Sequence, residues 1–513
     1  MAYNKEYFTN IVQLFGGMDV SSTPDVAAKR GKAEYILNCY NHPEGGVAKL
    51  FGRIKHNSVT IGANAEITGI FDLGLEATRS FFCIAENKFY KDNAGTWDDK
   101  TGSAIISDDK NNLWDFSKFQ DRLIGTSLHR DNPIEHDGAT GNVSNVSNMP
   151  AGKFNKVLAK RLFSINTKDQ PKLGYWSGIG DRTSWDETDD FLNFKGAEGD
   201  DAPVSGASEH LNNIIIGKES SVFRVYHTGT IPSFKYYRID DKTGVAGHFT
   251  MQSIPPAGTF PARLIWMGKD NFYQLIGDTI TSIGDDIKPF FGESHRVPFL
   301  INLARLRYCV SGIIKDKNLY FCAFSSGSNM QNDYCVVLDY KNMLWALCNF
   351  PVNYFATRQV GGRGFLYSGT YDGFIGRHDP SSYANLGAAY DSEYRTHWLD
   401  WGDPQLEKKV RYLIGLLGAI GNFTLAVGYR TNLATSWTSL GDFTMSTGGE
   451  ELGVDWALGT STLGGADLAE SVMELLKRFK RIQLKFTQTT INHYFRLYAL
   501  GFLHKPVKGY RIG

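Results

Sequence analysis

Several clusters of acidic side chains in this 513-residue chain are spaced closely enough to bind a cation. They lie in segments that we expect to be loops, at Asp98–Asp99, Asp186–Asp190, Asp240–Asp241 and Asp285–Asp286. Carboxylate oxygens are the ligands that hard cations prefer. Turns also favour Asp, because its side chain accepts hydrogen bonds from nearby backbone groups. We favour solvated turns over cation sites and predict no metal ligands.

Motifs that carry known catalytic chemistry are absent from the sequence. It contains no GxxxxGK[ST], HExxH or GxSxG motif and no zinc-ligand spacing, and its 12 histidines are dispersed. Asp92–Trp97 and Ser177–Trp185 are similar to the aspartate box of sialidase-like propellers, but that box is a structural turn. Sialidases also need an arginine cluster, which no spacing here identifies. We therefore predict that the protein is not an enzyme, with no catalytic residue and no cofactor.

The densest basic run lies near the end of the chain and has five members. They are Lys477, Arg478, Lys480, Arg481 and Lys485. We interpret them as contacts for DNA phosphates or for an acidic neighbouring subunit, with an ordinary solvated face as the alternative. Over the whole chain 54 basic residues balance 54 acidic ones. This balance argues against a general nucleic-acid or membrane-surface binder, although it leaves room for a local patch.

Composition and patterning indicate an all-β protein. Aromatic residues make up 13% of the chain, which also contains 54 glycines. The six cysteines form no CxxC pair, and we interpret them as buried thiols of a reduced compartment. We recognise no secretory signal, and the most apolar run, Tyr412–Ile420, is too short to span a membrane. We expect a soluble protein that is not inserted into a membrane.

A repeated pattern runs from Ile67 to Asp379, within a predicted propeller domain of residues 67–389: an apolar strand, a tight turn and a second strand that often ends in an aromatic residue. The leading strands begin near residues 80, 122, 161, 213, 264, 318 and 364. A period of about forty to fifty residues is typical of β-propeller blades. We predict a propeller of about seven blades, with six to eight possible and a long β-sandwich array as the alternative.

The segment Phe154–Phe194 contains one complete repeat. We expect Val157–Ala159 and Arg161–Ile165 to form one buried strand, and Leu173–Trp176 to return antiparallel beside it. Glycines near residue 180 then supply a turn, and Trp185 anchors the segment that follows. Such a small sheet cannot bury its apolar faces alone, so it needs similar neighbours.

Two further regions flank the predicted propeller. We interpret residues 1–66 as an arm with a short helix over residues 27–38. Its side chains Phe15, Ile36, Leu37 and Tyr40 must be buried somewhere, and we expect them to make contacts between subunits. Residues 390–513 favour a C-terminal β-sandwich. Within it, 431–465 read as loops and short hairpins, and 468–479 fit either a helix or a strand.

Three passages, in this order, resemble the β-propeller tail proteins of tailed phages, also called tail nozzle, tail hub, packaged-DNA stabilisation or tail tubular proteins. The first is Gly16–Ser21 followed by Ala33–Gly52, the second is Tyr175–Phe194, and the third is Lys480–Phe486. The sequence Lys-Leu-Phe-Gly that ends the first passage departs from the family's more usual basic-Pro-Gly ending. No separate domain that would plug the lumen is obvious.

The resemblance implies a structural component of a virion tail, made in the host cytoplasm. Identical subunits would form a ring, with a homo-hexamer expected, below the portal-adaptor ring and near tail fibre, spike or needle proteins. The ring would line the exit channel, help retain packaged double-stranded DNA without sequence preference and guide its ejection. The alternative is a carbohydrate-binding or glycan-degrading propeller at the host surface, with exposed tryptophans of Tyr175–Trp185 as its platform.

Overall fold

The computed structural model describes residues 8–506, except 15, 44, 63–64, 76–77, 196–200, 419–422 and 446–467. The chain divides into two compact units. The first comprises Met1–Arg53, Val336–Asn349 and Asp379–Gly513, and the second comprises Ile54–Cys335 and Phe350–His378. The expected arm of residues 1–66 is therefore shared between the two units.

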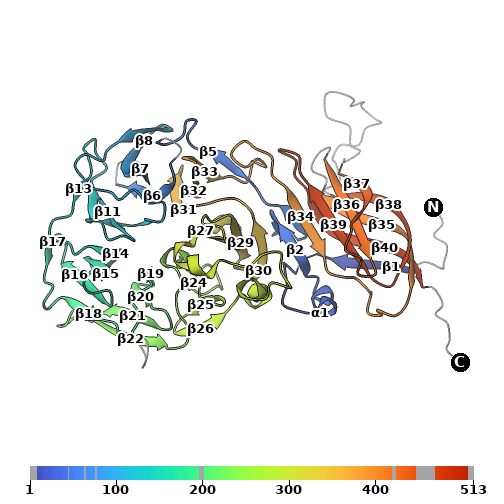
Figure 1. The fold of residues 1–513 in the computed structure, drawn as a ribbon, viewed down its shortest axis with the longest axis horizontal. Helices are drawn as coiled ribbons and strands as arrows, with labels where there is room; N and C mark the ends of the chain where they lie inside the picture. Colours follow the sequence, from blue (N-terminus) through green and yellow to red (C-terminus); the bar gives the residue numbers. More distant parts are fainter. Residues whose placement is uncertain are drawn as a thin grey trace. The chain divides into compact units, whose positions relative to one another are not determined.

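The second unit is a β-propeller, which confirms the predicted fold class (Figure 1). In the described part of the chain, six sheets of four or five strands belong to it: β6–β9, β10–β13, β14–β18, β19–β22, β23–β26 and β31–β33 with β5. The strands β27–β30 form a seventh group in the same chain order, and they are the first four strands of a nine-stranded sheet, β27–β28–β29–β30–β2–β34–β39–β36–β37. The division between the units falls inside β29. The strands counted in the second unit are β6 (Ile67–Gly74), β7 (Arg79–Ala85), β8 (Lys88–Asn93), β9 (Thr96–Asp99), β10 (Trp114–Phe119), β11 (Arg122–Ser127), β12 (Ile134–His136), β13 (Ser144–Asn145), β14 (Gly152–Leu158), β15 (Arg161–Thr167), β16 (Leu173–Gly178), β17 (Asp181–Trp185), β18 (Phe191–Asn193), β19 (Gly206–His210), β20 (Asn213–Gly217), β21 (Val222–His227), β22 (Phe234–Asp240), β23 (Gln252–Ile254), β24 (Arg263–Met267), β25 (Phe272–Ile276), β26 (Thr279–Ser282), β27 (Val310–Ile314), β28 (Leu319–Phe324), β31 (Tyr354–Val360), β32 (Arg363–Gly369) and β33 (Ile375–His378). Four 3₁₀ turns join them: η1 (His248–Thr250), η2 (Asp285–Phe291), η3 (Leu303–Tyr308) and η4 (Lys315–Lys317).

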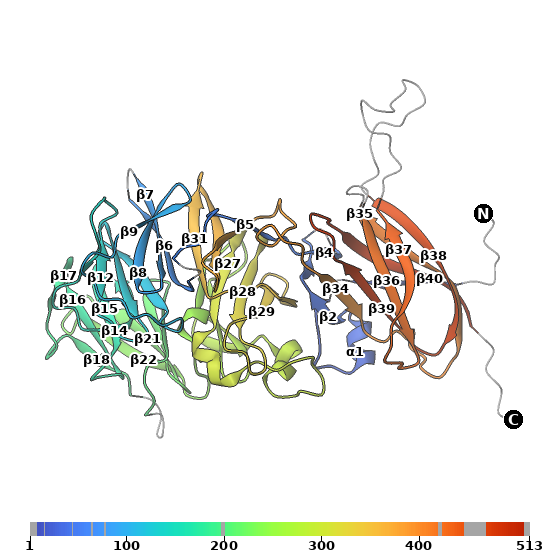
Figure 2. The same cartoon turned by 45° about the horizontal axis from the view of Figure 1, so that its top comes forward.

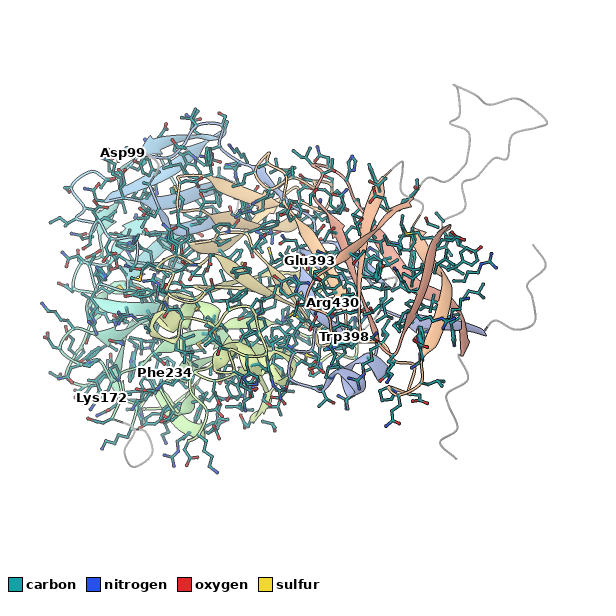
Figure 3. The ribbon with its side chains drawn as sticks, turned by 45° about the vertical axis from the view of Figure 1, so that its right-hand side comes forward. Asp99, Lys172, Phe234, Glu393, Trp398 and Arg430 are labelled. Carbon is teal, nitrogen blue, oxygen red and sulfur yellow. The ribbon has the colours of Figure 1, made fainter. Side chains whose placement is uncertain are left out.

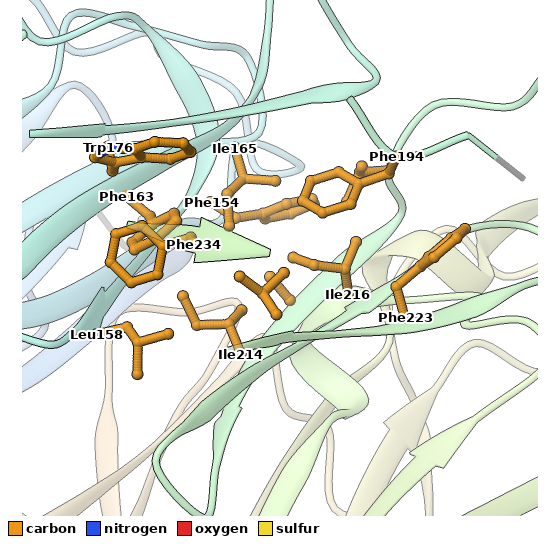
Figure 4. Packing of buried hydrophobic residues seen from close by; sticks show 13 residues of the cluster. Phe154, Leu158, Phe163, Ile165, Trp176, Phe194, Ile214, Ile216, Phe223 and Phe234 are labelled. Carbon is orange, nitrogen blue, oxygen red and sulfur yellow. The ribbon is translucent and has the colours of Figure 1, made fainter. Parts of the chain in front are cut away.

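Apolar side chains between successive sheets form the propeller's core. Between the β14–β18 and β19–β22 sheets, Phe234 meets the Trp176 ring edge-on, with 5.1 Å between ring centroids (Figure 4). The predicted return of Leu173–Trp176 beside the preceding strand is confirmed, because β16 pairs antiparallel with β15. The expectation of one strand over Val157–Ile165 is wrong. Ala159 and Lys160 both have positive φ, 49° and 59°, and turn the chain between β14 and β15.

A strand from early in the sequence closes the propeller. β5 (Arg53–Lys55) is the fourth strand of the β31–β33 sheet. Beyond it, the backbone N–H of His56 donates to Ile375 O at 2.8 Å, and Asn57 Oδ1 accepts from Ile375 N at 2.8 Å. The ring is thus held by strand pairing between residues more than three hundred positions apart, which tethers residues that we predicted as part of an arm.

The first unit is a β-sandwich, but the predicted bounds of 390–513 are too narrow, because both ends of the chain contribute strands to it (Figure 2). One layer has the order β3–β4–β40–β35–β38, with β1 on β40; the other has β30–β2–β34–β39–β36–β37. The Phe443 ring packs against Gly415 of the facing layer, where a Cβ would lie 2.7 Å from it. Its elements are β1 (Phe8–Gln13), α1 (Pro24–Lys29), β2 (Ala33–Leu37), β3 (Cys39–Asn41), β4 (Val47–Lys49), β29 (Tyr334–Asp339), β30 (Leu344–Cys348), β34 (Ser392–Thr396), β35 (Lys408–Gly418), β36 (Thr424–Thr431), β37 (Thr438–Thr444), β38 (Leu468–Phe479), β39 (Ile482–Gln488) and β40 (Arg496–Pro506).

The helix expected over residues 27–38 is wrong in its extent. α1 ends at Lys29, and Gly31 follows with φ of 65°, a conformation that stops a helix cheaply only at glycine. Residues 33–37 instead form β2, which pairs antiparallel with β34. The choice left open for 468–479 is resolved as the strand β38. Its apolar spacing of four residues fits a period of two as well as a helical turn.

Candidate functional site

The five basic residues predicted as a contact site do not form one patch. Lys477 and Arg478 are exposed on β38, and Lys480 is exposed just after it. The half-buried Arg481 lies 3.9 Å from the Asp400 carboxylate, which offsets its charge. Lys485 lies on β39 in the other layer of the sandwich. The run is therefore split between two faces.

Residues of a neighbouring strand extend the part of the run on β38. Lys409 of β35 stands directly opposite Arg478 in the antiparallel register, and both side chains are exposed. Arg411, two residues farther along β35, is also exposed. Like charges directly opposite each other are destabilising unless something of opposite charge neutralises them. We call Lys409, Arg411, Lys477, Arg478 and Lys480 the basic end of the sandwich. Sequence reasoning missed Lys409 and Arg411, because the pairing of β35 with β38 has no local signal.

Lys485 belongs instead to a group of cations around Trp437. Its ammonium lies 5.1 Å from the Trp437 ring centroid, and the Arg430 guanidinium lies 4.7 Å from that centroid. Arg430 also covers the Trp398 ring at 5.1 Å (Figure 3). Glu34 offsets part of this charge, with 3.7 Å to Arg430 Nη2. These cation–π contacts hold Lys485 against the sandwich itself.

The residues predicted to make contacts between subunits are buried by their own chain. Ile36 and Tyr40 are 1% and 6% exposed, and Leu37 is half-buried. Ile36 stands opposite Tyr394 in the pairing of β2 with β34. Phe15 lies outside the described residues. The burial that we expected from a neighbouring subunit is thus supplied by the sandwich, because the N-terminal strands are part of its sheets.

The acidic clusters differ in structure: Asp186–Asp190 form a turn, whereas Asp98–Asp99 end strand β9 and Asp285–Asp286 begin η2, so the expectation of loops is wrong for these two. Asp186 accepts hydrogen bonds from the N–H and hydroxyl of Thr188, at 3.0 and 2.6 Å, and these bonds lower the pKa of its carboxyl. Asp92, in the first of the two aspartate-box segments, accepts from Gly95 N at 2.9 Å. Within the part of the chain that the structure describes, no group of three or more His, Cys, Asp or Glu side chains could hold a metal ion.

The aromatic platform expected for carbohydrate binding is wrong. Trp176 is 2% exposed and Tyr175 is 5% exposed, and the Trp176 ring packs into the core shown in Figure 4. Trp185 is half-buried and donates its indole N–H to Arg182 O at 2.7 Å. Five consecutive residues of β16, Leu173–Ser177, are buried, so both faces of this strand are covered and its two aromatic rings are not exposed.

A buried ionic network lies where the first strands of several blades converge. Lys156 Nζ on β14 is 2.8 and 2.6 Å from the two carboxylate oxygens of Asp115 on β10. His248 Nε2 in η1 is 3.1 Å from Asp115 Oδ1. Asn155 adds two bonds, from its backbone N–H to Asp115 Oδ2 at 2.8 Å and from its side-chain amide to Asp115 O at 2.7 Å. Sequence reasoning did not identify any of these residues as a site.

The hydrogen bonds of the network define its protonation states. His248 Nδ1 accepts from Ala207 N at 3.1 Å, so the ring proton belongs on Nε2, which donates to Asp115. Burial lowers the pKa of His248 and keeps the imidazole neutral. Burial alone would raise the pKa of Asp115, but the charge of Lys156 and the hydrogen bonds from Lys156 and His248 outweigh it and lower that pKa to about 2. The site thus contains one carboxylate, one ammonium and one neutral imidazole.

The network borders a small polar cavity of about 170 Å³. Ser311 of β27 and Tyr354 of β31 also line it, and Tyr354 donates its hydroxyl proton to Trp114 O at 2.6 Å. Strands β10, β14, β19, β27 and β31 therefore all contribute residues to this cavity. Charged groups that are buried and mutually paired can fix the register of the elements that carry them. The arrangement joins the blades across the propeller axis.

Comparisons with known proteins give no family for this chain. No protein-family model matches the sequence, and no curated protein matches it. Among solved structures, YCF48 from Cyanidioschyzon merolae is 11% identical over 63% of this chain and 98% of its own, with a TM-score of 0.39. The β-propeller domain of Swd1 from Myceliophteria thermophila is 8% identical over 63% of this chain and 98% of its own, with a TM-score of 0.39.

A third similar structure is the extracellular domain of a hybrid two-component system from B. thetaiotaomicron. It is 8% identical over 65% of this chain with a TM-score of 0.41, and this chain spans 40% of its length. Likenesses this low say nothing about function, so the fold assignment rests on strand order.

Two other sequence expectations concern the whole chain. All six cysteines are buried thiols, as predicted. Among the described residues no helix is long and apolar enough to cross a membrane.

Proposed function

We propose that this protein is a structural component of a phage tail, a ring-forming nozzle or hub through which DNA leaves the head. The observation that carries the proposal is the basic end of the sandwich, in which Lys409 and Arg478 face each other across two strands. Such a pair gains stability when an anion neutralises it, and the phosphates of DNA or an acidic surface of a neighbouring subunit would do so.

Two further observations support a mechanical role. The propeller is closed by β5, and the sandwich is built from both ends of the chain, so each unit is held by pairing between distant segments. A unit held in this way resists deformation, which suits the wall of a channel through which DNA passes. The three passages that resemble the phage family contribute Ala33–Gly52 and Lys480–Phe486 to the sandwich and Tyr175–Phe194 to the propeller.

The proposal predicts a specific place for the protein in a particle. Electron microscopy of virions that carry this protein, with antibody or nanogold labelling of the chain, should show a ring coaxial with the DNA channel. A label found only on peripheral fibres would contradict the proposal, as would its absence from particles that are otherwise complete. The purified protein, sized by light scattering, should form a ring of identical subunits, and we expect six.

A further inference from the structure

A pocket of about 1050 Å³ in the propeller opens beside the ionic network. His248 lines both this pocket and the small polar cavity. Segments from several blades form its wall, and its apolar part includes Phe154, Pro203 and Leu306. A concave site of this size, apolar with a few convergent polar groups, is the usual form of a small-molecule site.

The charged groups around the pocket are predominantly cationic. They are Arg130 after β11, Lys153 in β14, Lys269 after β24, Arg307 in η3 and the carboxylate of Glu219 between β20 and β21, and the histidines His129 and His248 also line the pocket. Glu219 pairs with Lys269. That pair leaves the cations of Arg130, Lys153 and Arg307 without a carboxylate partner among the described residues.

These three cations line the same pocket, and Arg130 and Arg307 are close enough to Lys153 to repel its charge. Burial lowers the pKa of Lys153 to about 8, and repulsion from Arg130 and Arg307 adds to the shift. Arg130 Nε and Nη2 donate to Asn166 O and Asn166 Oδ1, at 3.0 and 2.6 Å, which fixes the guanidinium and leaves its Nη1 available. The exposed Arg307 lines the pocket, and its guanidinium carbon lies 4.7 Å from the Tyr308 ring centroid.

We propose that this pocket binds a phosphate group carried on a small, otherwise neutral molecule such as a sugar. A phosphate monoester carries nearly two negative charges at neutral pH and three acceptor oxygens. A single carboxylate would leave two of the three cations uncompensated. Guanidinium forks bind phosphate oxygens two at a time, and an ammonium adds a point charge. The apolar wall and the remaining volume would contact the neutral body.

The site implies a characteristic pH dependence. Bound phosphate favours the protonated form of Lys153, so binding at pH 8 should take up a proton. Because the pKa of Lys153 in the unoccupied protein is about 8, affinity should fall as pH rises from 7 to 9. Over that interval the second ionisation of phosphate, near pH 6, is already complete, and arginine stays charged, so the decrease reports Lys153.

Titration calorimetry on the full chain tests the proposal. The probes are inorganic phosphate and glucose 6-phosphate, with glucose and acetate as comparison ligands and a short DNA duplex as a separate arm. We expect both phosphate probes to bind, with the sugar phosphate tighter, and glucose and acetate not to bind. Affinity should fall about tenfold in Arg307→Gln and in Lys153→Gln. The control Lys88→Gln, on the exposed β8 pair with Asp99, changes net charge equally and should leave affinity unchanged.

Three outcomes would overturn the assignment: no phosphate binding, equal binding of acetate, or binding that both pocket variants leave intact. Circular dichroism of Arg307→Gln, whose side chain is exposed, would show that a loss of binding is not a loss of folding. The inference does not rest on the proposed tail function. The DNA duplex arm separates the two proposals. If the duplex binds, and substitutions at the basic end weaken this binding while the pocket variants do not, the result supports the tail function alone.

Discussion

Removing the charge of Asp115 should destabilise the propeller more than any single surface change. In Asp115→Asn the Lys156 ammonium, whose side chain is 11% exposed, would lose its carboxylate inside the propeller. The difference between the ordinary Asp pKa of 3.8 and about 2 corresponds to about 2.4 kcal/mol of stabilisation of the ionised form. The stranded ammonium adds to this, because breaking a buried pair from one side costs about 3–5 kcal/mol. We therefore expect a loss of about 3–5 kcal/mol.

Urea unfolding, monitored by hydrogen exchange in peptides from β10 and β14, would measure this loss of stability in the propeller alone. The matched control is Asp121→Asn, whose partner Lys118 lies 3.4 Å away with 44% of its side chain exposed. Surface pairs of this kind contribute about 0–1 kcal/mol. Adding Lys156→Met to Asp115→Asn should restore much of the stability, because the double variant removes both charges.

Acid titration provides a second test of the same network. A carboxyl whose folded pKa is lowered stabilises the fold fully above its unfolded pKa, and this stability is lost as pH falls through the folded value. The contribution of Asp115 should therefore disappear between about pH 4 and pH 2, and Asp115→Asn should lack that component. A loss below about 1 kcal/mol in Asp115→Asn, or an unchanged acid transition, would refute an ionised Asp115 paired with Lys156.

Three further predictions test the fold and the basic end. Leu162→Asp would place a charge beside Phe119, Ile124 and Met149 and should cost at least about 4 kcal/mol, so a soluble folded variant would contradict the blade assignment. Deleting residues 1–50 removes β1–β4, of which β1 and β4 pair with β40. Hydrogen exchange should therefore increase in β40 and its neighbour β35, while β6–β28 stay protected. Unchanged exchange in β40 would contradict a sheet formed by both ends of the chain. Duplex DNA should bind weakly and without sequence preference, and its affinity should fall as the salt concentration rises. Changing Lys477, Arg478, Lys480 and Arg481 to Ser should reduce both the affinity and its dependence on salt. Tight binding that persists at high salt would instead mean specific recognition.

The propeller could be predicted because its signal is local and repeated. Each blade alternates apolar strands with turns, so the period survives errors within single blades. One such error is the turn between β14 and β15, where Ala159 and Lys160 take positive φ without the Asn or Gly that such turns favour. The closing strand β5 has three residues, too short for any periodicity, and its partner β33 lies over three hundred residues later. No local pattern could connect them.

For the sandwich, too, the sequence indicated where strands form but not which strands pair. The strand character of residues 390–513 was visible, but the pairing of β4 and β1 with β40 joins opposite ends of the chain. We therefore interpreted Ile36 and Tyr40 as residues that a second subunit must cover. Because the chain's own sheets bury these side chains, they give no reason to expect a covering subunit. The side chains of the basic end, by contrast, are exposed.

The axial network could not be predicted from residue spacing, because Asp115 and Lys156 are 41 positions apart. A weaker signal does exist once the repeat is known. Both residues lie within the first strand of their sheet, in WDFSKF and GKFNKVL, where a charged side chain interrupts aromatic and apolar neighbours. First strands of neighbouring blades converge on the propeller axis, so opposite charges at such positions have one another as partners. The same rule draws attention to Lys153, which lies three residues before Lys156 on the same first strand. It lines the neighbouring pocket beside Arg130 and Arg307, and no carboxylate among the described residues pairs with it.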